Sequence, residues 1–130
     1  MKRTRHFIFI FVLAINIAGV YPAYAGDSSL ASAIIEVARN RVKAGHYEGA
    51  PIVFGALAAF GNAEAMVELG YLYANGRGVE RNPGEALRLY RQAAALGSAA
   101  AMNAIGYRYE YGPGVERDLS QAAEWYRWAA

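Results

Sequence analysis

The chain has 130 residues, of which 55% are hydrophobic and 18% are charged, and it contains no cysteine. Its formal net charge is +2, but removal of an expected leader takes three basic residues with it and leaves ten basic against eleven acidic residues, a net charge of −1. Arginines interspersed with glutamates form no phosphate-binding stripe, so nucleic acid is excluded as a partner. No disulfide can stabilise the fold.

Residues 1–25 have the three parts of a secretory signal peptide. Lys2, Arg3 and Arg5 form the basic start, residues 7–20 are apolar, and Ala23-Tyr24-Ala25 supplies small residues before a cleavage point at Ala25-Gly26. An uncleaved membrane anchor is the alternative, but the apolar run is shorter than the roughly 20 residues that cross a bilayer. We expect a mature chain, residues 26–130, that is periplasmic or secreted, with no stable membrane anchor after the signal is removed.

The mature chain contains two copies of one sequence unit, residues 61–96 and 97–130. A constant offset of 36 positions without a gap relates the identical residues, such as Gly70 and Gly106 or Tyr90 and Tyr126. A fixed period of this length predicts stacked helix pairs. The fold class expected is therefore all-α, an α/α solenoid of antiparallel helix pairs.

Residues 28–60 form a degenerate first pair. Its first helix has apolar residues at helical spacing, and its second lies in register with the later repeats, since Ala50, Phe54 and Ala58 precede Ala86, Tyr90 and Ala94 by 36 positions. The apolar residues of the first helix are Leu30, Ala33, Ile34, Val37 and Ala38. The connection between these two helices is expected to be shorter than in the later pairs.

The first full repeat predicts helices at about 63–74 and 83–96. Gly76 suits a left-handed C-terminal cap, and Asn82 followed by Pro83 suits the start of the second helix. The second repeat copies this plan with helices at about 99–110 and 119–130. Tyrosines at helical spacing are assigned to the core: Tyr73, Tyr90, Tyr109 and Tyr126.

Gly70 and Gly106 lie inside predicted helices, where glycine costs about 1 kcal/mol relative to alanine. We interpret both as points where the paired helix approaches closely.

Both repeats share one motif, formed in the first by Ala65, Leu69, Gly70, Tyr73, Gly76, Gly78, Val79, Asn82, Ala86, Tyr90, Ala93 and Ala94, with counterparts 36 positions later. This motif resembles that of the Sel-1-like repeat family, a branch of the tetratricopeptide superfamily. Ile105 in place of leucine is the one departure. The resemblance implies a solenoid that acts as an adaptor for other proteins, and motif residues that serve packing.

Some cysteine-rich relatives have been linked to penicillin binding or β-lactam hydrolysis, so an envelope enzyme or binder acting on peptidoglycan or β-lactams is the alternative function. This chain lacks the cysteines of that branch. His46 is the single histidine of the mature chain, too few for a metal or catalytic triad. We therefore expect no enzyme activity, no cofactor and no metal.

A candidate binding surface lies opposite the buried face of the first helix in each repeat. It comprises Glu64, Val67, Glu68 and Tyr71, with Asn103 and Tyr107 as the corresponding part of the next repeat. The glutamates, one turn apart, are interpreted as a solvated face. Tyrosine suits a groove that binds a peptide or protein segment, but packing of each tyrosine on the neighbouring helix is equally compatible with the sequence.

Trp125 and Trp128 lie in the last predicted helix, and Trp128 takes the position of Gln92. Solenoids need a polar terminal cap. The two indoles therefore either mediate self-association or contact with a partner, or lie flat against their own helix pair.

Overall fold

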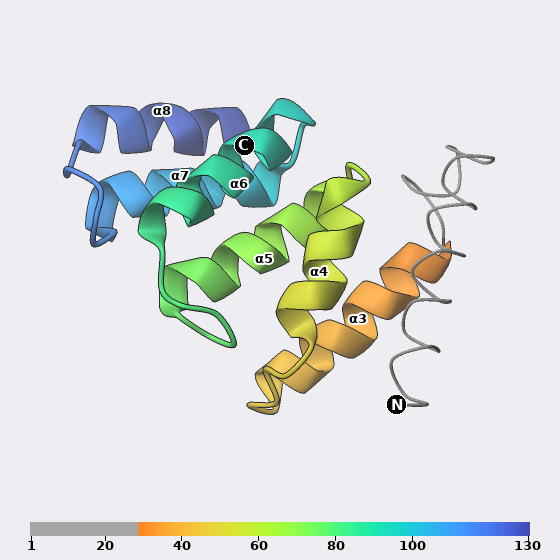
Figure 1. The fold of residues 1–130 in the computed structure, drawn as a ribbon. Helices are drawn as coiled ribbons and strands as arrows, with labels where there is room; N and C mark the ends of the chain where they lie inside the picture. The colour runs from red at the N-terminus through yellow and green to blue at the C-terminus, as the bar shows by residue number, and fades with distance from the viewer. Residues whose placement is uncertain (1–28) are drawn as a thin grey trace, which may run out of the picture.

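The computed structural model describes residues 29–130, and within that range the chain consists of α-helices that stack in sequence order (Figure 1). No strand occurs in this range, which confirms the all-α prediction. The helices are α3 (Ser29–Lys43), α4 (Ala50–Ala59), α5 (Ala63–Asn75), α6 (Pro83–Ala95), α7 (Ala99–Tyr111) and α8 (Leu119–Ala129).

The predicted signal peptide, residues 1–25, lies outside the described residues. None of the helices that the structure describes has the length and apolar character needed to cross a membrane.

Side-chain caps begin the four helices of the two full repeats. Asn62, Asn82, Ser98 and Asp118 each accept a hydrogen bond from the backbone N–H three residues later, at 2.9 to 3.2 Å. Each cap satisfies an N–H group that has no partner within the helix. As a result, the observed helices begin and end within one residue of the predicted positions.

The helix C-termini differ between the two repeats. Gly76 ends α5 with φ of 63°, the left-handed conformation predicted for it. Gly112 ends α7 with φ of −69° and ψ of 125°, so the second repeat does not copy this cap. Pro113 follows Gly112, and a residue before proline is restricted to the extended region. Arg77 at the same place in the first repeat imposes no such limit.

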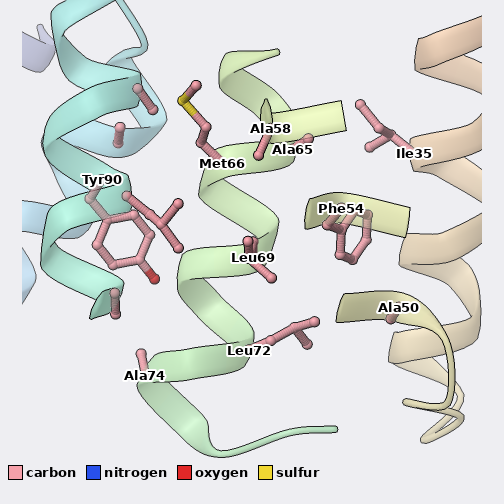
Figure 2. Packing of buried hydrophobic residues seen from close by; sticks show 14 of the residues in the cluster. Ile35, Ala50, Phe54, Ala58, Ala65, Met66, Leu69, Leu72, Ala74 and Tyr90 are labelled. Carbon is pink, nitrogen blue, oxygen red and sulfur yellow. The ribbon is translucent and has the colours of Figure 1, made fainter. Parts of the chain in front are cut away.

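The two helix glycines are points of close approach, as predicted. A Cβ on Gly70 would lie 2.6 Å from Cε1 of Tyr90, and a Cβ on Gly106 would lie 2.8 Å from Cε1 of Tyr126. Tyr90 is buried, and Figure 2 shows its ring turned from α6 toward α5. Each tyrosine ring therefore packs closely against the preceding helix at the position where a side chain is missing.

A continuous apolar core joins the helices. Its largest fully buried side chains are Phe54, Ile35, Leu72 and Ile105, and Phe54 lies between α3 and α5 (Figure 2). Of the four tyrosines assigned to the core, only Tyr90 is buried; Tyr73, Tyr109 and Tyr126 are half-buried.

Most of the apolar residues that mark the first helix in the sequence are not the ones it buries. Ala31, Ile35, Ala38 and Val42 are buried in α3, whereas Leu30, Ile34 and Val37 are exposed. The buried residues of α3 align with Ala65, Leu69 and Leu72 of α5 when the sequence is shifted by 34 positions. The buried residues of α4 align with those of α6 only at a shift of 36 positions. The buried residues of α3 and α4 are thus two positions closer in sequence than those of α5 and α6. The connection itself, residues 44–49, is one residue shorter than residues 76–82, as a shorter connection was expected.

Candidate functional site

Arg39 of α3 joins both glutamates of the candidate surface. Its Nε donates to Glu68 at 2.7 Å and its Nη2 donates to Glu64 at 2.5 Å, while Nη1 donates to Glu36 of its own helix at 2.9 Å. The hydrogen bond to Glu64, with the charge of Glu68, raises the pKa of Arg39 above its ordinary value. The acidic pair on α5 is therefore an ion-pair contact with α3 and not simply a solvated face.

A second cluster lies toward the C-terminal end of α5. The guanidinium of Arg77 lies 5.5 Å from the ring centre of Tyr47 and 5.4 Å from that of Tyr71. Its Nη1 also donates to the hydroxyl of Tyr71 at 2.8 Å. Cation–π contacts with two rings and a hydrogen bond hold this cation in one place. Tyr71 is 37% exposed, so one side of its ring stays open to solvent.

Residues from both clusters line one cleft of about 240 Å³ between α3 and α5. Its walls are formed by Arg39, Val42, Lys43, Glu68, Tyr71 and Arg77. Charge changes along it: Glu68 lies on the N-terminal half of α5, whereas Lys43 ends α3 and Arg77 follows the C-terminus of α5. The cleft thus offers an acidic end, a basic end and an aromatic ring between them.

The remaining predicted groove residues lie further along the stack. Val67 is half-buried and packs against the core. Asn103 and Tyr107 are exposed on α7, where the rings of Tyr107 and Tyr111 meet at a tilt of 49° with centres 5.3 Å apart. The structure therefore brings Glu68 and Tyr71 together at one cleft, joins Glu64 to it only through Arg39, and places Asn103 and Tyr107 one repeat away.

The corresponding position of the second repeat has different chemistry. Ala100 and Ala104 replace the two glutamates, and Pro113 replaces Arg77. The charged cleft therefore belongs to the α3–α5 junction alone among the repeats that the structure describes. It is not part of the packing pattern that the two repeats share.

The two tryptophans of α8 have unequal environments. Trp125 is half-buried and packs against the core, whereas Trp128 is 60% exposed. Their rings meet edge to face with centres 4.8 Å apart. One indole thus packs on its own helix pair, and the other is available at the surface.

The second repeat also contains a polar contact between its two helices. The Tyr126 hydroxyl donates to Glu110 at 2.9 Å. Burial, together with this bond, raises the pKa of Tyr126 to about 12. Hydrogen bonds from Tyr111 and Tyr126 lower the pKa of Glu110. The geometry is that of a contact joining α7 to α8.

Metal-binding clusters of histidine, cysteine, aspartate or glutamate are absent from residues 29–130. His46 lies exposed in the turn before α4, without a nucleophile or carboxylate hydrogen-bonded to it in this range.

Sequence reasoning missed Arg39, Lys43, Tyr47 and Arg77. A signal for Arg39 was present, because two glutamates one turn apart have no basic residue at the same spacing on their own helix, which points to a cation from a neighbouring helix.

Comparisons with known proteins agree with this architecture. The Sel1 repeat family model matches residues 63–98 and 99–130, and no curated protein matches the chain. A similar solved structure is the crystal structure of a Sel1 repeat protein from Oxalobacter formigenes, at 33% identity and a TM-score of 0.61. The match covers 74% of this chain and 38% of that one, so the chain spans well under half the length of that protein.

Proposed function

The chain belongs to the Sel1 repeat family, and we propose that it is an exported interaction module that holds a segment of a partner protein along α3, α5 and α7. Sel1 repeat proteins are generally protein-interaction modules and are typically not enzymes. The proposal adds where on the molecule the partner binds, along α3, α5 and α7, and that the protein acts outside the cytoplasm.

The α3–α5 cleft is the observation that carries this proposal. Tyr71 is 37% exposed, and its hydroxyl and ring are already held by Arg77, so little side-chain freedom is lost when a ligand packs on it. Amphipathic, immobilised tyrosines of this kind are frequent among residues that dominate binding energy. Tyr107 offers a second exposed ring one repeat further along.

The charges of the cleft favour a segment with a carboxylate at one end. Arg39 has three glutamate partners, whereas Lys43 has no ion-pair partner among the described residues and Arg77 contacts only aromatic rings and a hydroxyl there. An acidic side chain beside Lys43 and Arg77 would form charge-assisted hydrogen bonds. A basic or neutral residue fits the glutamate end.

Export is proposed from the order of the N-terminal features: a basic start, a short apolar run and small residues before Gly26. Mass analysis of the protein recovered from the cell envelope tests it. A mature chain that begins at Gly26 is expected, and retention of Lys2 would contradict export by cleavage.

Site-specific photo-crosslinking in living cells tests the interaction surface. A photoreactive phenylalanine replaces Tyr71, Tyr107 or, as the control, Phe60, which is 39% exposed at the end of α4 and thus close in exposure to Tyr71. The same partner should be captured from Tyr71 and Tyr107 but not from Phe60. Capture only from Phe60, or equally from all three positions, would refute the assignment of the groove.

A further inference from the structure

The first helix pair has a broad apolar side that no described helix covers. α3 and α4 form one end of the described stack (Figure 1), and three large side chains are mostly exposed there: Leu30 at 66%, Val37 at 63% and Ile52 at 64%. Exposed apolar side chains gathered on one helix pair mark interaction surfaces more often than single exposed apolar residues do.

α4 itself indicates that both of its sides are covered in the working molecule. Its sequence, APIVFGALAA, contains no polar side chain. A helix that is apolar all round is normally buried all round. α5 covers the side of α4 that carries Phe54, but Ile52 on another side faces solvent.

A hollow of about 460 Å³ lies between α3 and α4, and the exposed Val37 and Ile34 help to line it. Its lining is apolar except at the rim, where Arg41, His46 and Glu48 lie. Neither Arg41 nor Glu48 has an ion-pair partner within residues 29–130. An apolar floor with one unpaired cation and one unpaired anion at its rim has no net charge.

The apolar character of this side is specific to α3. At the offset of 34 positions that aligns the buried stripes, Leu30, Ile34 and Val37 correspond to Glu64, Glu68 and Tyr71 of α5. On α5 the two glutamates of this stripe bind the preceding helix α3 through Arg39. On α3 the same stripe is apolar, so it is suited to contact with another apolar surface and not with a cation.

We propose that this face is a homodimer interface, in which two copies of the chain meet through α3 and α4 about a two-fold axis. A two-fold interface must be complementary to itself. If one residue of the first copy contacts a second residue of the other copy, the symmetry repeats that contact with the copies exchanged. The apolar floor meets this condition, and Arg41 of each copy pairs with Glu48 of its partner. The dimer leaves the α3–α5 cleft of each copy free, so it would present two binding grooves and raise the avidity for a repetitive partner.

Charge reversal at the rim tests the dimer. The mature chain, purified after export, is examined by sedimentation equilibrium over a range of concentrations. Arg41→Glu alone and Glu48→Arg alone should each weaken dimerisation by about tenfold or more, because each change places two like-charged pairs in the interface. The double variant Arg41→Glu/Glu48→Arg restores the pairs with their signs exchanged, so it should recover most of the affinity.

Lys43→Glu is the matched control, because it reverses a charge on the same helix but at the α3–α5 cleft. It should leave dimerisation unchanged. Val37→Glu provides a second probe of the apolar floor and should give a monomer. Circular dichroism confirms that each variant is folded; all the changed side chains are exposed.

A wild-type monomer throughout the concentration range would overturn the proposal. A dimer that resists both single reversals and Val37→Glu would do so too, and loss of that dimer on Trp128→Gln would place the contact on α8. These outcomes do not depend on the groove, so the dimer and the proposed partner binding can fail separately.

Discussion

Replacement of Gly70 by alanine tests how the repeats pack. It should stabilise the helix through propensity and destabilise the fold through overlap with Tyr90. Alanine in a helix interior is favoured over glycine by up to about 1 kcal/mol. At Gly70, however, the added Cβ would lie 2.6 Å from Cε1 of Tyr90 and 3.0 Å from two further ring carbons. Tyr90 is 3% exposed, so its ring cannot swing into solvent.

Gly55 provides the matched control for this change. It also lies inside a helix, α4, but a Cβ there would meet nothing within 4 Å. Gly55→Ala therefore shows the helix-propensity gain without a clash. The difference in unfolding free energy between Gly55→Ala and Gly70→Ala isolates the overpacking cost, which we expect to be about 1 to 3 kcal/mol.

Urea denaturation followed by circular dichroism measures both variants. Gly55→Ala should be more stable than the wild type, and Gly70→Ala should be less stable than Gly55→Ala by the amount above. Tyr90→Leu removes the ring, so Gly70→Ala made in that background should cost less than in the wild type. Equal stabilisation by Gly55→Ala and Gly70→Ala would show that the Tyr90 ring does not pack against the α5 backbone.

Two further predictions concern the charged and titrating groups. Burial raises the pKa of Tyr90 from 10.0 to about 12, so the folded state holds the hydroxyl proton more tightly than the unfolded state does. The resulting contribution to the free energy of unfolding is fully present below pH 10 and is lost as pH rises toward 12. At about 1.4 kcal/mol per pKa unit the loss is about 3 kcal/mol, and alkaline unfolding of Tyr90→Phe should be correspondingly less steep. Arg39→Met should lower the unfolding free energy by about 1 to 3 kcal/mol, because it leaves the partly buried Glu68 without its partner. Its effect should shrink in high salt, measured by urea titration with and without about 1 M NaCl, and a salt-independent loss would point to packing instead.

Local sequence signals were sufficient for the helices of the two full repeats. Caps such as Asn82 and Asp118 act within three residues, and close packing at Gly70 and Gly106 follows from the cost of glycine in a helix. Where a local rule failed, a neighbour in the chain had changed: Pro113 forces Gly112 out of the left-handed cap.

The site was less predictable, because its residues come from different helices. Arg39 lies 25 and 29 positions before its partners Glu64 and Glu68, outside the repeat offset that organises the rest of the chain. Sequence spacing did not show which side of α3 is buried, because both its exposed stripe and its buried stripe are apolar. Whether the groove tyrosines bind a partner remains a prediction.

Affinity for the partner captured at the groove tests the central claim most directly. Isothermal titration compares the mature wild type with Tyr71→Ala/Tyr107→Ala and with Phe60→Ala, each first checked for helicity. We predict a loss of about 2 kcal/mol or more, roughly 30-fold in Kd, for the tyrosine variant and little change for Phe60→Ala. Unchanged affinity in a folded Tyr71→Ala/Tyr107→Ala variant would contradict the account.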